Sequence, residues 1–453
     1  MLFNYLTNII EIERGSEAIV WHNTTYTYAW LKLKIEQWKV ELNDRMIGEG
    51  TVVALQGDFS PNAIALLIAL IQRCCIIVPI ATKIQLQQEE YCRIAQVQYL
   101  LTIDKNDQVK FSKHEGQVKN VLLLKLKEKQ HPGLIIFSSG STGKSKAAVH
   151  DFIPLLEKFK QPKRRMRTIA FLLFDHIGGI NTLFYTLFNG GCLIVPVTRT
   201  PQQVCDAIAR FHAQALTTTP TFLNLLLISG MIENYDLSSL RVINYGTEVM
   251  QEATLNDLHT LLPNVRLSQA YGLSEVGVLP VRSKSSDSVY FKIDNDGFNT
   301  RIVDGLLEIK SHSFMLGYLN APNPFTEDGW FKTGDAIETN GEYLRVLGRK
   351  SELINVGGEK VYPVEIENIL QQIQGVDQVA VFSEANAIIG QIIVARIKLK
   401  VDEPLSDFRP RLYAFCKTRL PGYKIPQKII LTNDVLYNER FKKIRLTGVH
   451  NEN

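Results

Sequence analysis

The chain lacks the cysteine patterns of a disulfide-linked or zinc-binding protein. Six cysteines are spread over 453 residues, with no CxxC pair and with two of them adjacent, at positions 74, 75, 92, 192, 205 and 416. Small secreted domains and zinc sites both use recurring short spacings between cysteines. The sequence therefore predicts free, buried thiols in a reducing cytoplasm.

The first residues do not have the pattern expected of a secretion signal, and the sequence contains no long apolar run without charges. The N-terminal stretch MLFNYLTNIIEIERG has no basic segment ahead of an apolar core. The most apolar window, residues 63–80, is interrupted by Gln72, Arg73 and Pro79, and an arginine near mid-bilayer costs ~2.5–3.5 kcal/mol on insertion scales. We expect no membrane span there. Ser60-Pro61 should instead begin a buried helix of about three turns that leads into a buried strand.

A strong excess of either charge is missing as well. The formal net charge is +4, so the charge balance indicates neither nucleic acid nor a membrane as a partner. Apolar content of 45% and charged content of 21% are ordinary for a globular protein, and the length predicts two or more domains. The densest basic stretch, residues 158–167, is either a solvated loop or a surface patch for the phosphates of a thiol donor or for an acidic carrier protein.

Helices and strands alternate through the first 130 residues. The spacing predicts a helix over residues 30–43, buried strands over 51–56 and 75–80, and further strands over 99–103 and 121–124. This alternation is typical of a doubly wound α/β layer with a largely parallel sheet.

Two later regions have a different pattern. Alternation over residues 299–309 predicts a small antiparallel sheet or barrel. The last 100 residues predict a small α+β domain, with helices over 364–372 and 405–419 and strands over 379–383 and 392–398.

One stretch, residues 137–150 with the sequence FSSGSTGKSKAAVH, has the composition of a phosphate-binding loop. Its glycines allow close backbone approach, and its N–H groups, hydroxyls and lysines can surround a polyphosphate. A plain surface turn is the alternative. Gly143-Lys144-Ser145 mimics the end of a Walker A loop, but the leading glycine would fall at Ser138. Because residues 146–150 are typical of a strand, we expect the loop to join two strands.

Two further motifs offer nucleotide-binding groups. In YGLSEVG (271–277), Tyr271 can face a purine, the Ser274 hydroxyl can contact phosphate oxygens, and Glu275 can hold a magnesium ion that bridges the triphosphate. In Thr333-Gly334-Asp335, a glycine turn presents a carboxylate that can accept from both ribose hydroxyls. A simple Asx-type turn is the alternative for this second motif.

Together these motifs resemble the adenylate-forming (AMP-binding) superfamily of acyl-CoA synthetases, luciferases and peptide-synthetase adenylation domains. Residues 137–150 resemble its [ST]SG[ST]TGxPKG loop, with Ser145 in place of the proline, and residues 271–277 resemble YGxTE. Residues 438–445 (NERFKKIR) resemble RTxxGKIxR, with Lys443 aligned with the lysine and Lys442 replacing the glycine. At least six motifs follow the family order over nearly the whole chain.

The resemblance implies an α/β fold in two parts. A large N-terminal domain (1–348) would contain two α/β subdomains and a small β-barrel. A hinge (349–352), with Ser351 as its pivot, would join it to a small mobile C-terminal α+β domain (353–453).

The implied activity is ATP- and magnesium-dependent activation of a carboxylic acid as an acyl-adenylate, with release of pyrophosphate, followed by transfer to a thiol. Coenzyme A is the expected acceptor, because the ending resembles free-standing acid–thiol ligases with no fused carrier domain. Loading of a phosphopantetheinyl carrier protein is one alternative. A nucleotide-binding pseudoenzyme is another, given the substitutions at Ser145, Ser351 and Lys442.

The resemblance also implies roles for individual residues. The catalytic set is Lys443, Glu275, Thr142 and His176, with Glu275 as the metal ligand and Lys443 bridging the substrate carboxylate and the α-phosphate. The nucleotide would contact Ser138, Ser139, Gly140, Ser141, Thr142, Gly143, Lys146, Gly246, Thr247, Glu248, Tyr271, Gly272, Ser274, Asp335, Arg349 and Lys443. The acid pocket would comprise Phe174, Asp175, His176, Gly179, Met250, Val276 and Gly277, and the thiol tunnel Gly357 and Gly358.

Two acid-pocket residues keep alternative interpretations. His176 is expected to gate the acyl site from the thiol tunnel, although a histidine before a glycine turn can be purely structural. Asp175 either pairs with an amino or hydroxyl group of the substrate or caps the next helix. The mixture of polar and apolar walls is compatible with aryl, medium-chain acyl or functionalised acids.

Overall fold

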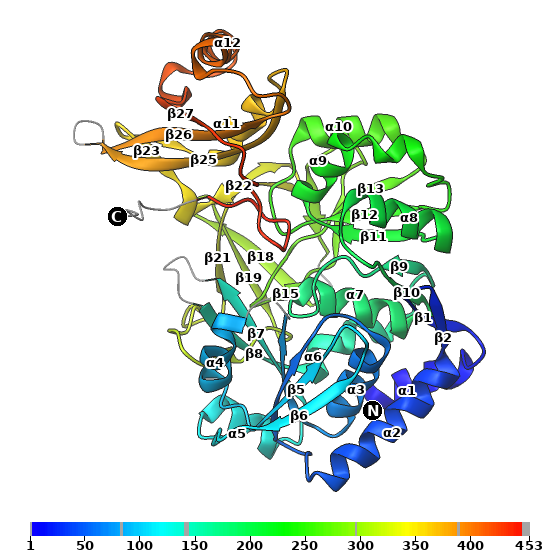
Figure 1. Ribbon diagram of the computed structural model, residues 1–453. Coiled ribbons are helices and arrows are strands. Elements are labelled where there is room, and N and C mark those ends of the chain that lie inside the picture. Colours follow the sequence, from blue (N-terminus) through cyan, green and yellow to red (C-terminus); the bar gives the residue numbers. More distant parts are fainter. Residues whose placement is uncertain (1, 82–84, 140–144, 295–296, 387–389, 446–453) are drawn as a thin grey trace.

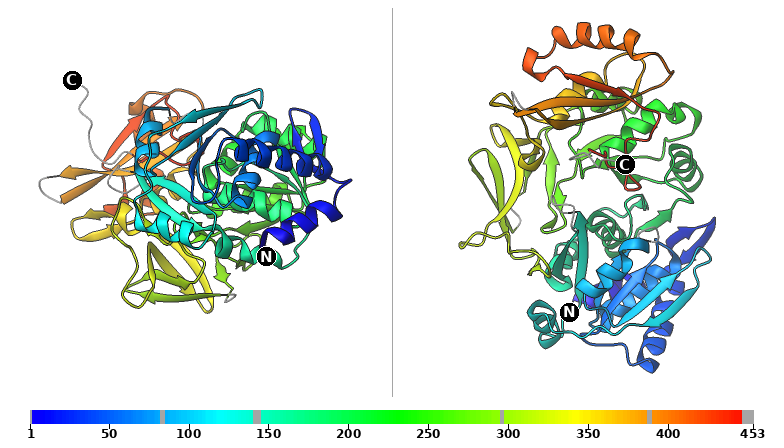
Figure 2. Two further views of the ribbon diagram at one scale, coloured as in Figure 1. Left: turned by 90° about the horizontal axis from the view of Figure 1, so that it is seen from below. Right: turned by 60° about the vertical axis from the view of Figure 1, so that its left-hand side comes forward.

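The computed structural model describes residues 2–81, 85–139, 145–294, 297–386 and 390–445 (Figures 1 and 2). In Figure 1 one α/β layer, drawn from blue to cyan, forms the lower part of the molecule, a second, mainly green α/β layer lies on the right, and a smaller domain, drawn mainly in orange, lies at the upper left. A third sheet, in yellow-green, lies on the left of the right-hand view of Figure 2, between the orange domain above and the blue layer below.

The first α/β layer is built on a seven-stranded sheet that is parallel except at one edge. Its order is β13 (Arg266–Gln269), β12 (Val242–Tyr245), β11 (Ala215–Thr218), β9 (Arg167–Ile169), β10 (Cys192–Val195), β1 (Glu17–Trp21) and antiparallel β2 (Thr24–Thr27). Its helices include α8 (Pro201–Phe211), α9 (Pro220–Ile228) and α10 (Glu252–Leu261).

The second layer has another seven-stranded sheet with a parallel centre. Its order is β20 (Gly317–Tyr318), β8 (Ser145–Asp151), β7 (Gly133–Ser139), β4 (Ile76–Ile80), β3 (Val52–Gln56), β5 (Tyr99–Ile103) and β6 (Val109–Lys113). The helices of this half of the chain are α1 (Leu2–Ile12), α2 (Tyr28–Asp44), α3 (Pro61–Gln72), α4 (Gln85–Ile94), α5 (Val121–Glu128), α6 (Phe152–Glu157) and α7 (Ile177–Phe188).

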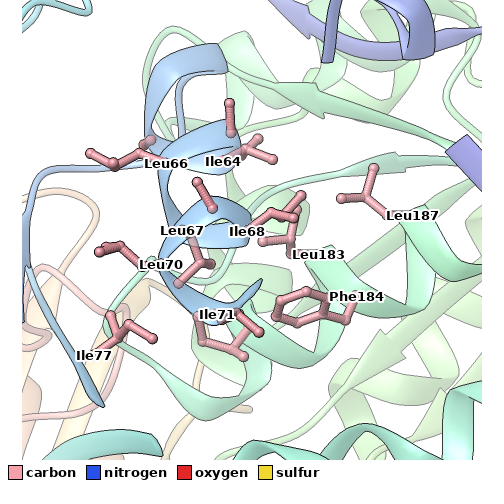
Figure 3. Close-up of a cluster of buried hydrophobic side chains, with 14 of the residues drawn as sticks. Ile64, Leu66, Leu67, Ile68, Leu70, Ile71, Ile77, Leu183, Phe184 and Leu187 are labelled. Atoms are coloured by element: carbon pink, nitrogen blue, oxygen red, sulfur yellow. The ribbon is translucent and has the colours of Figure 1, made fainter. Parts of the chain in front are cut away.

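The apolar helix α3 is part of a large hydrophobic core that it shares with α7. The Ser60 side chain accepts from the Ala63 N–H and caps the helix as expected. Ile64, Leu67 and Ile68 face the α7 side chains Leu183, Phe184 and Leu187 (Figure 3). A helix that is apolar all round is stable when protein surrounds it. Among the described helices, none has the length and hydropathy to cross a bilayer.

Two smaller sheets complete the large domain. The segment predicted to form a small antiparallel sheet or barrel is part of a six-stranded antiparallel sheet. Its order is β16 (Val281–Ser283), β17 (Phe291–Ile293), β22 (Tyr343–Arg349), β21 (Phe331–Asn340), β19 (Leu306–Ser311) and β18 (Phe298–Val303). A short hairpin joins β14 (Gly272–Leu273) to β15 (Gly277–Val278).

The small domain has its own sheet and core. Its strands are β24 (Glu359–Val361), β23 (Ile354–Val356), β26 (Gly390–Leu399), β25 (Val376–Asn386) and β27 (Lys428–Leu431), packed with α11 (Pro363–Leu370) and α12 (Leu405–Lys417). The predicted α/β fold with a large N-terminal part and a small C-terminal α+β part is confirmed.

One predicted strand is wrong. Residues 121–124 form the start of α5, because the Asn120 side chain accepts from the Leu122 N–H and caps a helix. Leu123 and Leu126, three residues apart, are its buried face, so the short apolar run belongs to a helical stripe.

Candidate active site

The phosphate-loop motif lies between two paired strands, as predicted. β7 and β8 are antiparallel, with Ser138 opposite Lys146 and Ser139 opposite Ser145. Asn320 fastens the end of β8: its Nδ2 donates to the Ser145 carbonyl at 2.8 Å, and its Oδ1 accepts from the Ala147 N–H at 2.9 Å. The predicted contacts of Gly140, Ser141, Thr142 and Gly143 lie outside the described residues.

Strand β8 also contacts the YGLSE motif. His150 Nε2 donates to the Ser274 carbonyl at 2.6 Å, and burial lowers the pKa of His150 to about 4, so the ring is neutral. The Tyr318 hydroxyl donates to Glu275 Oε1 at 2.6 Å, and Lys146 Nζ lies 5.5 Å from the Tyr318 ring centre. The Lys146 ammonium and the Glu275 carboxylate therefore both lie next to Tyr318.

Asp335 lies at the centre of a second polar cluster. Its Oδ2 accepts from the Tyr271 hydroxyl at 2.6 Å, and its Oδ1 lies 3.2 Å from Arg349 Nε. Burial raises the pKa of Asp335, with the guanidinium of Arg349 opposing this shift and the charge of Glu275 adding to it. The Tyr271 ring stacks on Phe291 at 5.7 Å between ring centres. Each carboxylate oxygen still has a lone pair for a further donor, such as a ribose hydroxyl.

The segment from Gly246 to Glu248 packs against the backbone just before Tyr271. A Cβ at Gly246 would lie 2.4 Å from the Ala270 carbonyl, so only glycine fits there. Glu248 joins two parts of the chain: its Oε2 accepts from the Thr221 hydroxyl at 2.6 Å, and its Oε1 accepts from the Lys443 N–H at 2.8 Å.

The segment 437–443, here called the C-terminal hairpin, leaves the small domain and contacts the large one (red in Figure 1). The Phe441 carbonyl accepts from the Thr219 hydroxyl at 2.9 Å. The Phe441 ring lies 5.2 Å from Phe171 and 5.5 Å from Phe222, centre to centre. Arg440 Nη2 pairs with Asp175 Oδ2 at 2.7 Å. Aromatic packing and a largely buried ion pair together hold the hairpin in the cleft.

His176, and not Asp175, caps helix α7. His176 Nδ1 accepts from the Gly178 N–H at 3.0 Å, and burial, followed by the charges of Lys442 and Arg440, lowers the pKa of the ring. The helix-cap interpretation of Asp175 is therefore wrong, because its Oδ2 serves Arg440 and the Ala81 N–H. Burial raises the pKa of Asp175, and its Oδ1 is buried without a hydrogen bond.

The other acid-pocket candidates lie in different parts of the large domain. Phe174 packs edge-on against Phe59 in the main core, with ring centres 5.3 Å apart. A Cβ at Gly179 would lie 2.1 Å from the Leu173 carbonyl, which marks close packing at the start of α7. Val276 is buried beneath the third sheet, and Gly277 has φ +76°.

Two cavities meet at the hairpin. The larger, about 340 Å³, lies between the domains and is lined by residues that include Thr247, Met250, Gly272, Tyr271, Asp335 and Arg349 together with Lys442 and Lys443. This volume suits a small molecule. The smaller, about 10 Å³, is lined by His176, Thr247, Arg440, Phe441 and Lys442, among others, and has the volume of about one water molecule.

Lys443 binds a buried acid of the small domain. Its Nζ lies 3.1 Å from Glu367 Oε2, which also accepts from Arg445 Nη2 at 2.8 Å. Burial opposes ionisation of Glu367, but the charges of Arg445 and Lys443 outweigh it and lower the pKa to about 2. Glu367 is 1% exposed.

This depressed pKa makes the Glu367 contribution pH-dependent. The unfolded chain binds the extra proton, so the stabilisation is complete above pH 4.5 and is lost as the pH falls toward 2. We expect Glu367→Gln to destabilise the protein by about 3–5 kcal/mol at pH 7. Thermal melting of both proteins from pH 7 to 2 should show the two curves converging in acid; a constant difference in melting temperature would contradict the assignment.

The proposed hinge and tunnel residues lie at the edge of the small domain. Ser351 is exposed in a single 3-10 turn (Lys350–Glu352) that follows β22. Gly357 and Gly358 form the turn between β23 and β24, with φ of +59° and +95°. The Gly358 N–H donates to Asn355 Oδ1 at 2.9 Å. The small-domain core begins at Ile354, just after this 3-10 turn.

Comparison with known protein families decides the relationship. The AMP-binding enzyme family matches residues 10–289, more than half of the chain, and the AMP-binding enzyme C-terminal domain matches residues 365–442. The chain belongs to the AMP-binding enzyme family. The superfamily resemblance found in the sequence is thereby confirmed.

Curated relatives of this AMP-binding protein include CoA ligases. It is 27% identical to an indoleacetate–CoA ligase of Aromatoleum aromaticum, over 68% of this chain and 64% of the relative. It is also 27% identical to a 2-succinylbenzoate–CoA ligase of Enterococcus faecalis, over 65% of this chain and 64% of the relative. The match thus spans a little under two thirds of these relatives' own length.

Solved structures share the fold of this AMP-binding protein over nearly its whole length. The anthranilate CoA ligase AuaEII, in complex with anthranoyl-AMP, has a TM-score of 0.82 at 17% identity and covers 98% of this chain and 95% of its own. ATP-bound MatB from Rhodopseudomonas palustris has a TM-score of 0.78 at 21% identity, with coverage of 97% and 96%.

Several site residues have no motif of their own in the sequence. His150 is the last residue of the phosphate-loop motif, and Asn320 lies outside the motifs described above; both hold backbone groups in place. Tyr318 reaches Glu275 only because β20 pairs with β8. Glu367 is an acid inside an ordinary amphipathic helix, and only the tertiary structure shows that it lies against Lys443 and Arg445.

Proposed function

We propose that this protein activates a carboxylic acid with ATP and transfers the acyl group to a thiol, as an AMP-forming acid–thiol ligase. The observation that carries the proposal is that Lys442 and Lys443 of the C-terminal hairpin line the same cavity as Asp335, Tyr271 and Arg349. These groups lie far apart in the sequence, and they combine a ribose acceptor with cations for phosphate. The names of the curated CoA ligases support the same reaction class.

The first step joins two anions. A carboxylate oxygen of the acid forms a bond to the α-phosphorus, the bond from that phosphorus to the bridging oxygen breaks, and pyrophosphate leaves with the electron pair. Asp335 and Arg349 would hold the ribose, and Lys146 and the hairpin lysines would offset the repulsion where negative charge develops. Positioning and charge suffice, so no covalent enzyme intermediate is needed.

Magnesium fits the residues at the base of the phosphate loop. Glu275 presents a hard carboxylate, oriented by the Tyr318 hydroxyl, beside Lys146. When bound there, the ion would neutralise charge on the phosphates. Glu275 is the residue that we assign to hold it.

The second step would form the thioester. The thiol gives up its proton to solvent, its sulfur forms a bond to the acyl carbonyl carbon, and the bond from that carbon to the phosphate oxygen breaks, so that AMP leaves with the electron pair. By family resemblance, the small domain turns about Ser351, withdraws the hairpin and brings Gly357-Gly358 to the thiol tunnel. We favour coenzyme A as the acceptor, with a phosphopantetheinyl carrier protein as the second candidate, and a cytoplasmic location, which free thiols suit.

Most basic side chains of residues 158–167 contact other parts of the chain, which leaves few of them to bind an acidic carrier protein. Several of its charges have partners within the chain: Lys158 Nζ donates to the Val278 carbonyl at 2.8 Å, Lys160 pairs with Glu157 at 2.9 Å, and Arg165 pairs with Glu13 at 2.6 Å. Arg167 pairs with Glu17. The contacts favour a structural role for most of the stretch.

A direct assay tests the proposed function. The protein is incubated with ATP, magnesium and a panel of aryl, medium-chain and functionalised acids, and pyrophosphate is measured. We expect acid-dependent pyrophosphate release, followed by a thioester of matching mass when coenzyme A or a carrier is added. ATP binding without pyrophosphate release for any acid would instead support the pseudoenzyme alternative. Thermal shift with the same panel ranks the acids.

A further inference from the structure

Tyr91, on helix α4, joins the two strands that carry the phosphate-loop motif. Its ring stacks on the Phe137 ring of β7, with 3.8 Å between the ring centres and an angle of 3° between the ring planes. Its hydroxyl lies 3.0 Å from the Ser145 hydroxyl at the start of β8. Helix α4 lies beside both strands (Figure 1). One side chain therefore contacts the last part of β7 and the first residue of β8.

The hydrogen bonds around the Tyr91 hydroxyl have one direction. This hydroxyl has a single proton, which it donates to Gln87 Oε1 at 3.0 Å. The Ser145 hydroxyl is consequently the donor to the Tyr91 oxygen. Tyr91 is only 6% exposed, so water has little access to the oxygen that joins the two hydrogen bonds, and the loss of a partner there is costly.

Ser145 is held from a second side by Asn320. Asn320 Nδ2 donates to the Ser145 carbonyl, and Asn320 Oδ1 accepts from the Ala147 N–H. The Asn320 contacts hold the backbone at Ser145, and the Tyr91 contact holds its side chain. Two separate parts of the chain thus determine the position at which β8 begins.

Ser145 stands where the family motif that residues 137–150 resemble has a proline. A proline ring fixes φ near −65° and so restrains the backbone from within the residue itself. A serine has no such restraint, and its conformational freedom is lost only through contacts with other residues. Its hydroxyl, however, can donate to Tyr91, which a proline cannot do. Tyr91 and Ser145 therefore form a matched pair at this position.

The backbone held by this pair carries residues that are expected to contact ATP. Ser139 lies opposite Ser145, and Ser138 lies opposite Lys146, in the paired strands. Because backbone pairing joins the two strands, a displacement of Ser145 would displace Ser139 and Lys146 as well. Groups that act on a reacting phosphate need to be held within about 0.5 Å of their productive positions.

We propose that Tyr91 is a positioning residue for the phosphate-binding strands, and that its pair with Ser145 replaces the restraint of a proline ring. The proposal rests on the proposed adenylation reaction, in which these strands would hold ATP. Tyr91 is not among the described residues that line the cavity between the domains. It acts on the nucleotide through the position of Ser145.

Exchange kinetics of single and double variants test the pair. We expect Tyr91→Phe, which keeps the ring and its stack, and Ser145→Ala each to raise the KM for ATP in acid-dependent pyrophosphate exchange about fivefold. The double variant should be no worse than either single variant, because both changes remove the same hydrogen bond. Ser145→Pro in the Tyr91→Phe protein should return the KM to within about twofold of wild type. Multiplied effects in the double variant, or no rescue by proline, would overturn the proposal.

Tyr28→Phe separates positioning from general stability. It removes a buried hydroxyl that donates to the Gly191 carbonyl at 2.7 Å, at the start of α2 and outside the β7–β8 pair. We expect a lower melting temperature with an unchanged KM for ATP. If Tyr28→Phe raised the KM as much as Tyr91→Phe does, Tyr91 would act only through stability and the proposal would fail.

Hydrogen–deuterium exchange tests the pair without any acid substrate. In the Tyr91→Phe protein, peptides from β7 and β8 should take up deuterium faster than in wild type, and peptides from the small domain should not change. Unchanged uptake in β7 and β8 would overturn the positioning role. If the wild-type protein exchanges pyrophosphate with no acid, the proposed function fails, while the uptake still decides whether Tyr91 holds the two strands.

Discussion

Replacing Glu275 by glutamine is expected to lower acid-dependent pyrophosphate exchange at least 100-fold. The amide keeps the size of the side chain and can still accept from the Tyr318 hydroxyl, which donates to Glu275 Oε1 at 2.6 Å. It loses the negative charge that a hard divalent cation needs, and a single electrostatic contact in the transition state is worth about 10²–10³ in rate. Exchange is measured at saturating ATP over a range of magnesium concentrations.

Tyr318→Phe is the matched control for this experiment. It removes the hydroxyl that orients Glu275 but leaves the carboxylate in place. We expect a loss of about tenfold or less, with a small rise in the magnesium concentration that gives half-maximal rate. An unchanged magnesium response in Glu275→Gln, with full activity, would show that the metal is held elsewhere.

Asp335→Asn is expected to weaken ATP binding about 100-fold. Asp335 is buried and accepts from Tyr271 and Arg349, so the amide both weakens the ribose contact and leaves Arg349 without its counter-charge. Hydrogen bonds to a charged acceptor contribute about 1.5–3 kcal/mol each, and about 2.7 kcal/mol corresponds to a 100-fold change. Equilibrium binding of ATP by calorimetry measures the loss, and circular dichroism checks the fold.

A comparison of nucleotides separates ribose binding from a general defect. The wild-type protein should bind 2′,3′-dideoxy-ATP far more weakly than ATP, and Asp335→Asn should bind the two alike. Tyr271→Phe, which removes one hydrogen bond to Asp335 but keeps its charge, should retain most of the discrimination. Equal preference for ATP in all three proteins would exclude Asp335 as the ribose acceptor.

The order of short motifs predicted the fold because the local structure of each motif is determined mainly by residues close to it in the sequence. The Ser60-Pro61 cap, the apolar helix after it and the strand–loop–strand around residues 137–150 depend mainly on neighbouring residues. The strand predicted at 121–124 was wrong because a four-residue apolar run fits either a strand or a helix. The Asn120 cap decides in favour of the helix.

The details of the site could not be predicted, because they depend on contacts between distant segments. The sequence shows two lysines in a row but not which side of the hairpin each one faces; that depends on the bridge between Tyr437 and Lys443 and on Glu367, 76 residues earlier in the chain than Lys443. Asp175 likewise gave two interpretations, and its partner Arg440 is 265 residues away.

The central claim is that Glu275, Asp335 and the C-terminal hairpin serve one nucleotide. A crystal structure with a non-hydrolysable ATP analogue and magnesium tests it most directly. The account predicts a magnesium ion about 2.0–2.1 Å from a Glu275 oxygen, the ribose hydroxyls on Asp335, and a lysine of the C-terminal hairpin beside the α-phosphate. A nucleotide bound away from Glu275 and Asp335 would contradict it.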